Sequence, residues 1–367
     1  MNEYNRIILI GNGFDRAAGL KTSYKDFINS YIKNAVRCFF LENEYDSELI
    51  SIRKKSRNYR ESLKELLDAL DKKESAIDAL KFIEGVSTIQ YKHSFFEEII
   101  KTNNERWVDI EQYYFDKLLS IYNLTGHSNP FKRKLSRIEE LNGFMDVLTS
   151  KLHTYISEVD SSAKISFVNS PLSSLIEKSQ SKLNDEVSGL ISRHSRREDP
   201  NNVIFLNFNY TNTVRSLTNN SFVKNNIRHI NIHGQINNSN NPIIFGYGDD
   251  TNESYNRLEF EDNNELIRKI KSFQYPRTRN YHHLLNILGS KEFDIFIVGH
   301  SCGLSDRTLL KTIFEHENCL AIQNFHYKGE TDDFNKRMQI SRHFSNKTLM
   351  RERVLPFDSQ AIIPQNK

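Results

Sequence analysis

The chain has 367 residues, of which 38% are hydrophobic, and its mean hydropathy is −0.60. Its 50 basic and 47 acidic residues leave a net charge of +3, a near balance that speaks against a dedicated nucleic-acid-binding protein. The length allows two packed units, and no apolar stretch approaches the roughly 20 residues that a membrane-spanning helix needs.

The cysteines and the N-terminal residues indicate the cellular compartment of the protein. Cys38, Cys302 and Cys319 have no CxxC spacing, so they predict neither a zinc ribbon nor a disulfide framework. The N-terminal residues lack the charged and apolar regions of a secretory signal. We therefore expect a cytoplasmic protein with reduced thiols.

The first predicted element is a buried strand at residues 6–10, Arg-Ile-Ile-Leu-Ile, followed by Gly-Asn-Gly-Phe-Asp at residues 11–15. Glycine has no Cβ, so such a turn can bring backbone N–H groups close to a phosphate. The spacing is not Gly-x-Gly-x-x-Gly, and no Walker lysine follows. The turn can equally be a tight corner between a strand and a helix, without a ligand.

The middle of the chain has the periodicity of helices. Leucines at positions 63, 66, 67 and 70 share one helical face, and a second apolar face runs from Phe144 to Tyr155. Residues 165–168 are the one candidate strand in this part of the chain. We expect mostly helices, separated by polar loops, between Phe27 and about Pro200.

Strand-like runs return in the last third of the chain, and most of them are short and rich in β-branched or aromatic residues. They are residues 203–207, 227–232, 242–245, 293–298 and 320–323. The pattern predicts an α/β fold in which a Rossmann-type, mostly parallel sheet is interrupted by a large helical insertion. The expected core is residues 1–30 plus 200–330, the insertion is 31–199, and 331–367 form a C-terminal extension.

Polar residues follow four of the predicted strands. They are the turn at 11–15, Asn-Phe-Asn-Tyr-Thr-Asn at 207–212, His233 with Gly234, and the segment from Gly299 to Asp306. Ligands of open α/β sheets bind at the carboxyl ends of the strands, so these segments are expected to meet in one crevice. Each also has a plainer interpretation, such as an Asx-turn or a simple His-Gly turn.

One of these segments suggests a different enzyme. Gly-His-Ser-Cys-Gly at residues 299–303 has the Gly-x-Ser-x-Gly pattern of a nucleophile elbow, which would make Ser301 the nucleophile of a serine hydrolase. Its triad would need Asp332 or Asp333 with His343, and the short stretch to His343 leaves little room for the βα units that normally carry those partners. The elbow also leaves the first glycine turn and Asn209 unexplained.

The carboxylates offer a further alternative, a metal-dependent nuclease. The candidates match no metal-binding motif, so no metal is expected. They are Asp15, Asp109, Glu111, Asp249, Asp250 and Asp306.

Taken together, these pieces resemble the AbiH family of bacterial phage abortive-infection proteins over about residues 6–325. The matching segments are 10–15 with 19–20, Trp-Val-Asp-Ile-Glu at 107–111, 207–211, 233–234, Phe-Gly-Tyr-Gly at 245–248, and 299–306. The resemblance implies a role in defence against phage, and it does not specify a reaction.

A more distant resemblance, to sirtuins and sirtuin-like NAD hydrolases, supplies a reaction. The order of a strand, a glycine turn, an asparagine after a strand, a histidine before glycine and a Gly-x-Ser is similar. Asp15 and Thr211 depart from that pattern, and the cysteine zinc module is absent. The resemblance implies catalysis by Asn209 and His233. It implies binding of NAD by Gly11, Asn12, Gly13, Phe14, Asp15, Asn207, Gly299, Ser301 and Asp306.

The expected reaction is hydrolysis of NAD⁺ to nicotinamide and ADP-ribose. His233 suits a general base because the ordinary pKa of histidine, about 6.5, lies near working pH. Asn209 would hold the ribose or the attacking water, backbone amides of residues 11–14 would bind the pyrophosphate, and Asp15 would cap the next helix or bind a ribose hydroxyl.

The expected ligand is a nucleotide, with no membrane or nucleic-acid partner. A phage-derived trigger or partner protein and a homo-oligomer are left open. A non-enzymatic alternative is a nucleotide-sensing module whose helical insertion binds a partner.

Overall fold

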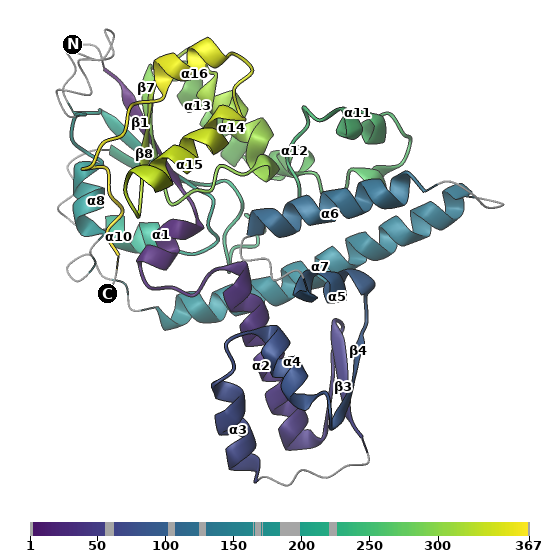
Figure 1. Cartoon of the computed structure of the whole chain (residues 1–367). Helices are drawn as coiled ribbons and strands as arrows, with labels where there is room; N and C mark the ends of the chain where they lie inside the picture. Colours follow the sequence, from purple (N-terminus) through teal and green to yellow (C-terminus); the bar gives the residue numbers. More distant parts are fainter. Residues whose placement is uncertain are drawn as a thin grey trace. The chain divides into compact units, whose positions relative to one another are not determined.

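The computed structural model describes residues 3–55, 62–101, 107–124, 130–163, 165, 170, 172–183, 199–219 and 226–365 (Figure 1). The chain divides into two units. One comprises Met1–Leu20 with Ile156–Lys367, and the other is Lys21–Tyr155. Among the described residues, no helix combines the length and the apolar character that crossing a bilayer requires.

The first unit is built on a five-stranded parallel sheet in the order β6-β5-β1-β7-β8. Its strands are β1 (Asn5–Ile10), β5 (Asn202–Asn207), β6 (Asn226–Asn231), β7 (Phe293–Val298) and β8 (Cys319–Phe325). All residues of β1, β7 and β8 are buried, as expected for strands covered on both faces. The predicted α/β class and parallel sheet are thus confirmed.

Alternate residues of β1 contribute to two separate cores. Ile7 and Leu9 pack with α13 (Asn280–Ser290) and α14 (Arg307–Phe314), whereas Ile8 and Ile10 pack with helices on the other face. Those helices are α1 (Asn12–Ala17), α8 (Ser173–Lys178) and α10 (Thr213–Thr218). Figure 1 shows the two groups of helices on opposite sides of the strands. Because α1 and α14 follow the neighbouring strands β1 and β7, the connections leave the sheet in opposite directions at that point.

Shorter elements complete this unit. They are α11 (Glu253–Glu259), η1 (Asn264–Leu266), α12 (Lys271–Gln274), η2 (Tyr275–Arg277), η3 (Leu304–Asp306), α15 (Glu330–Ser341) and α16 (Lys347–Arg353). The last residues pack with the sheet, since Val354 and Ile362 form bridges with Ile322 and His326. Residues 331–367 therefore belong to the same compact unit as the strands.

A buried ion pair joins β1 to β7. Arg6 lies opposite Asp294, and its Nε and Nη2 donate to the two carboxylate oxygens at 2.8 and 2.7 Å. Arg6 Nη1 also donates to the carbonyl of Ser179, and the guanidinium lies 3.9 Å from the ring centroid of Phe296. Both charged side chains are at most 1% exposed, so each relies on the other for compensation of its charge.

The second unit combines helices with a small antiparallel sheet in the order β2-β3-β4. The strands are β2 (Glu44–Asp46), β3 (Ile50–Lys54) and β4 (Ser87–Tyr91). The helices are α2 (Tyr24–Glu42), α3 (Leu63–Asp71), α4 (Ala76–Ile83), α5 (Ser94–Lys101), α6 (Trp107–Tyr122) and α7 (Pro130–Ser162), whose last residues count with the first unit. The sequence predicted the helices and missed the sheet, because its strands are short and lie between strong helical patterns.

Trp107 anchors the core of the second unit. Its indole stacks on Phe27, with ring centroids 5.8 Å apart, and meets Tyr24 edge to face. The indole N–H donates to the carbonyl of Thr22 at 2.9 Å. The motif at residues 107–111 thus begins with a structural aromatic residue.

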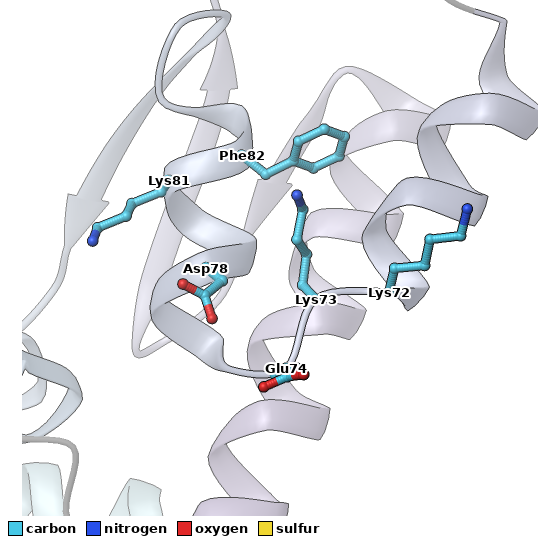
Figure 2. Close-up of a pocket in the computed structure, with 6 residues that line it drawn as sticks. All are labelled: Lys72, Lys73, Glu74, Asp78, Lys81 and Phe82. Carbon is cyan, nitrogen blue, oxygen red and sulfur yellow. The ribbon is translucent and has the colours of Figure 1, made fainter.

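A shallow pocket lies between α3 and α4 (Figure 2). It is lined by Lys72, Lys73, Glu74, Asp78, Lys81 and Phe82. Lys73 points toward the Phe82 ring, with Nζ 4.6 Å from its centroid. Its other charged side chains are exposed, so the pocket has the character of a solvated surface.

One predicted strand, at residues 242–245, differs from the structure. Residues 242–245 form a loop whose Ile244 N–H donates to the carbonyl of His233, without pairing along a strand. Ile244 and Phe245 are buried, which explains why the apolar run resembled a strand. The predicted strand at 165–168 lies, apart from Ile165, outside the described residues.

Candidate functional site

The polar segments that follow the strands meet at one edge of the sheet. Ile10 lies opposite both Asn207 and Val298, so the residues after β1, β5 and β7 leave the sheet side by side. The segment after β6 reaches the same edge, because His233 contacts Asp306. This edge is where open parallel sheets bind ligands.

A buried carboxylate, Asp306, is the centre of four charged or titratable side chains, here called the Asp306 cluster: Asp306, Lys271, His233 and His300. Lys271 Nζ donates to Asp306 Oδ1 at 2.7 Å, and His233 Nε2 lies 3.2 Å from the same oxygen. His300 Nε2 lies 3.5 Å from Oδ2. All four are buried.

The Phe-Gly-Tyr-Gly segment explains how Lys271 reaches this cluster. Tyr247 N–H donates to the carbonyl of Lys269, and Lys271 N–H donates to the carbonyl of Tyr247. A Cβ on Gly246 would lie 2.0 Å from the Lys269 carbonyl oxygen, and one on Gly248 would lie 2.5 Å from that of Ser305. The two glycines therefore let this segment pass between the residues that precede Lys271 and Asp306.

The charges of the cluster are nearly balanced. Burial alone would raise the pKa of Asp306, but Lys271 and the two imidazoles outweigh it and hold that pKa well below its usual range. Burial favours a neutral His300, yet its contact with Asp306 raises the pKa of the imidazole. Cys302 N–H donates to His300 Nδ1 at 3.1 Å. This contact requires an unprotonated Nδ1, so it opposes the charged form of His300 that Asp306 favours by raising the pKa to about 9, and in this geometry the ring proton lies on Nε2. The carboxylate thus pairs with Lys271 beside two imidazoles.

His233 is held in one tautomer. Because Asp306 is ionised, His233 Nε2 carries the proton that faces it, and Nδ1 keeps a lone pair. Tyr275 Oη lies 3.5 Å from Nε2, and Phe208 meets the ring edge to face at 4.9 Å between centroids. Among the described residues, none forms a hydrogen bond with Nδ1.

The pKa of His233 differs from the ordinary value used in the sequence argument. Burial and the nearby Lys271 charge lower the pKa to about 4, although Asp306 opposes them. The imidazole is therefore neutral at pH 7. It can accept a proton, but it is a weaker base than an exposed histidine.

A second polar group lies on the α1 face of the sheet. Thr211 donates its hydroxyl to Asp15 Oδ2 at 2.7 Å, and the Thr213 hydroxyl lies 3.2 Å from that of Thr211. The N-cap of α1 is Gly11, so the expectation that Asp15 caps this helix is wrong. Burial raises the pKa of Asp15 to about 7.

Asn209 connects the two faces. Its Nδ2 donates to the Gly11 carbonyl at 3.0 Å, and its backbone N–H donates to Asn207 Oδ1 at 3.0 Å. Asn207 in turn donates to Asn231 Oδ1. The two asparagines predicted as site residues thus hold the turns after β1 and β5 together, and Asn207 positions Asn209.

The first glycine turn is closed by the protein itself. Gly11 N–H donates to the carbonyl of Val298, Gly13 N–H to that of Gly299, and Phe14 N–H to that of Gly11. These three amides donate within the protein in this conformation, so the binding of a pyrophosphate by residues 11–14 stays a prediction that would require these hydrogen bonds to break. The glycines are needed because the turn packs directly on the segment after β7: a Cβ on Gly11 would lie 2.4 Å from His300 Cα.

Gly13→Ala is expected to destabilise the protein whether or not a nucleotide is present. The new Cβ would lie 2.8 Å from Gly299 Cα and 2.0 Å from Tyr327 Oη, and the glycine backbone cannot move away without breaking the Gly13–Gly299 hydrogen bond. We expect a loss of about 1–3 kcal/mol in the free energy of unfolding, as in other overpacked sites. Urea denaturation measures it, and Gly143→Ala, where a Cβ meets no atom within 4 Å, is the control. Equal stability of the two variants would contradict this packing.

Ser301 does not have the setting of a nucleophile. The positive φ in this turn, +52°, belongs to Cys302, whereas an elbow strains the serine itself. His343 Nε2 lies 2.8 Å from the Cys302 carbonyl oxygen. Asp332 accepts a backbone N–H, and Asp333 accepts an asparagine side chain. The histidine and both candidate acids thus face other partners, so the geometry does not support the serine-hydrolase alternative.

The carboxylates of the nuclease alternative are also separately engaged. Asp249 pairs with Arg307, Asp250 accepts the Thr308 hydroxyl, and Asp306 pairs with Lys271. Within the described ranges, no group of three or more His, Cys, Asp or Glu side chains is arranged to hold a metal ion.

Sequence reasoning missed two members of the site and left a third without a role. Lys271 follows Arg-Lys-Ile in a stretch that reads as an exposed basic run, and Tyr275 precedes a proline in a loop. His300 lies inside the Gly-x-Ser pattern but was given no role. Only the His300 position carried a signal, because it directly follows Gly299, the first residue after β7.

Stability is expected to fall as the pH falls from about 6.5 to 4. Burial lowers the pKa values of His229, His233 and His343 to about 4, so the unfolded chain binds protons in this range that the folded protein does not. Asp15 opposes the trend, because its raised pKa keeps it protonated in the folded state. Three histidines outweigh one carboxyl group, so the thermal midpoint should be lower at pH 5 than at pH 7.

Calorimetry at constant ionic strength measures this dependence. His343→Gln should flatten it, since the variant removes one of the three histidines. An unchanged slope in that variant would contradict the role of His343.

The comparison with protein families covers most of the chain. The sequence matches the family described as "Bacteriophage abortive infection AbiH" over residues 7–327, a range that includes every member of the Asp306 cluster. No curated protein matches the sequence.

Proposed function

The chain belongs to the AbiH family of bacteriophage abortive infection, and we propose that it serves this role by hydrolysing NAD⁺ to nicotinamide and ADP-ribose. In abortive infection the infected cell stops supporting phage growth. Removal of NAD⁺ would halt the metabolism on which the phage depends. A fold does not determine a reaction, so the evidence for this activity lies in the side chains of the site.

The reaction breaks the bond between the nicotinamide nitrogen and C1′ of the ribose. The bonding electrons go to the nicotinamide ring, which leaves neutral, and positive charge develops on the ribose. A water oxygen then bonds to C1′, and the proton it loses must go to a base. Solvent finally takes this proton, so NAD⁺ and water yield nicotinamide, ADP-ribose and a proton.

The observation that carries the proposal is the orientation of His233. Asp306 holds its Nε2–H, which leaves the Nδ1 lone pair to accept the proton of the water. Asn209 stands at the same strand ends, and its amide oxygen can accept a hydrogen bond from the water or from the ribose. A neutral imidazole oriented by a buried carboxylate is a common arrangement for a general base.

The test is the NAD⁺ content of bacteria that express the chain, with and without phage challenge, compared with bacteria that express His233→Ala. Loss of NAD⁺ that requires the histidine, with nicotinamide and ADP-ribose as products, is the expected result. Protection against phage with a steady NAD⁺ pool would refute the hydrolase. Tight binding of NAD⁺ without turnover by the purified protein would instead support a nucleotide-sensing module.

A further inference from the structure

Two buried oxygen atoms beside Gly13 have no hydrogen-bond partner among the described residues: Asp15 Oδ1 and Tyr327 Oη. They come from different elements, since Asp15 lies in α1 and Tyr327 follows β8. A buried polar atom without a partner costs about 1–3 kcal/mol. Two such atoms at one turn call for a ligand that would satisfy them.

Burial of the Asp15 carboxyl group costs free energy that a purely structural role would not require. Asp15 is 1% exposed, and the side chains that stabilise its charged form by hydrogen bonds are neutral, those of Thr211, Thr213 and Asn209. Within the described ranges, no lysine or arginine forms an ion pair with it. An asparagine could accept the same hydrogen bond without burying a titratable group. We therefore infer that the carboxyl group has a role other than stabilising the fold.

The Tyr327 hydroxyl is directed at the same turn. Its Oη would lie 2.0 Å from a Cβ on residue 13, so it occupies the space that the glycine leaves open. The backbone N–H of Tyr327 donates to Asp332 Oδ2 at 2.8 Å, and the preceding His326 pairs with Ala361. These contacts hold the loop that carries the phenol.

We propose that Asp15 and Tyr327 form a subsite for the vicinal hydroxyl groups of the adenosine ribose of NAD⁺. This assignment rests on the proposed function. His233 packs against Phe208 and Tyr275 of the core on the α14 face, whereas Asp15 lies in α1 on the other face. We therefore assign the nicotinamide ribose to His233 and the other ribose of the dinucleotide to Asp15. A carboxylate accepts hydrogen bonds from both hydroxyls of such a diol, and the tyrosine hydroxyl can donate to one of them.

The subsite makes the protein specific for NAD⁺ over NADP⁺. NADP⁺ carries a phosphate on the 2′ oxygen of this ribose, which removes one donor and places negative charge against the buried carboxylate. Like charges in a buried site repel strongly, so the phosphorylated ribose is excluded when Asp15 is ionised, above its raised pKa of about 7. Replacement of Asp15 by a neutral residue should weaken this discrimination.

The experiment is calorimetric binding of ADP-ribose and of 2′-phospho-ADP-ribose to the full chain. Both probes lack the bond that is broken, so turnover does not interfere. Asp15→Asn should lower the affinity for ADP-ribose about 10-fold or more, and Tyr327→Phe should lower it severalfold, as expected for lost hydrogen bonds to a charged and to a neutral group. The preference for ADP-ribose over its 2′-phosphate should shrink in Asp15→Asn.

Two matched controls separate the subsite from a general loss of polar groups. Asp249→Asn neutralises another buried aspartate, and Tyr24→Phe removes another buried hydroxyl without a partner among the described residues. Both should bind ADP-ribose like the unaltered chain.

If Asp15→Asn binds both probes with unchanged affinity, the subsite is refuted while NAD⁺ hydrolysis stands. If the unaltered chain binds neither ADP-ribose nor NAD⁺, both proposals fall. A preference of the unaltered chain for the 2′-phosphate would also overturn the subsite.

Discussion

His233→Ala is expected to lower the turnover of NAD⁺ by about 10²–10⁴-fold, the usual contribution of a positioned general base. The variant removes an imidazole that the ionised Asp306 orients through Nε2. Among the described residues, none forms a hydrogen bond with its Nδ1, which is therefore able to accept a proton. The affinity for NAD⁺ should change little, because the base acts on water. Turnover by the purified protein and calorimetric binding give the two quantities.

His229→Ala is the matched control. The His229 pKa is also lowered to about 4 by burial, but the ring lies in β6 and bonds to the Thr218 hydroxyl, away from the Asp306 cluster. This variant should keep its turnover. Equal losses in the two variants would mean that removal of a buried imidazole, and not of a base, causes the effect. Full activity in His233→Ala would refute the assigned role.

Arg6→Met is expected to lower the free energy of unfolding by about 3–5 kcal/mol, because it leaves the buried Asp294 carboxylate without a partner. Methionine fills part of the volume of the arginine stem and can pack on Phe296. The lost contacts are the bidentate bond to Asp294 and the bond to the Ser179 carbonyl. Urea denaturation measures the change.

The double variant Arg6→Met/Asp294→Leu tests the cause. If the cost comes from an unpaired charge, removal of the second charge should restore most of the stability, since apolar replacements of a buried pair are often neutral. A double variant as unstable as Arg6→Met would show that packing, and not charge, dominates here. Asp249→Leu, beside the half-exposed Arg307, is a useful comparison because that pair is only partly buried.

Some of the site could be predicted because it lies next to strong local patterns. The runs at β1, β5 and β7 are largely apolar, so their ends are easy to locate, and parallel strands bring their carboxyl ends to one edge. Asn209 and Asp306 follow such strands, whereas His233 follows β6, whose residues are mostly exposed or partly exposed. The role of the glycines could not be predicted, because the same sequence is compatible with a turn that binds a phosphate and with a turn that packs tightly against its neighbours.

The residues that complete the site were hidden for a different reason. Lys271 and Tyr275 lie in short helical elements without a periodic pattern, and long-range contacts bring them to His233 and Asp306. The local sequence does not distinguish a buried lysine from an exposed one. The strands β2, β3 and β4 were likewise missed because strands of three to five residues carry too few alternations to be told from loops.

The sequence by itself determined the fold class, the family and the strand ends that carry His233, Asn209 and Asp306, because apolar periodicity and glycine positions are local properties. Only the tertiary structure decided that the first glycine turn is closed by Gly299 and that Lys271 pairs with Asp306. It also decided that the pKa of His233 falls to about 4 while that of Asp15 rises to about 7. Hydrogen-bond partners and burial depend on residues far apart in the chain, and no local pattern encodes them.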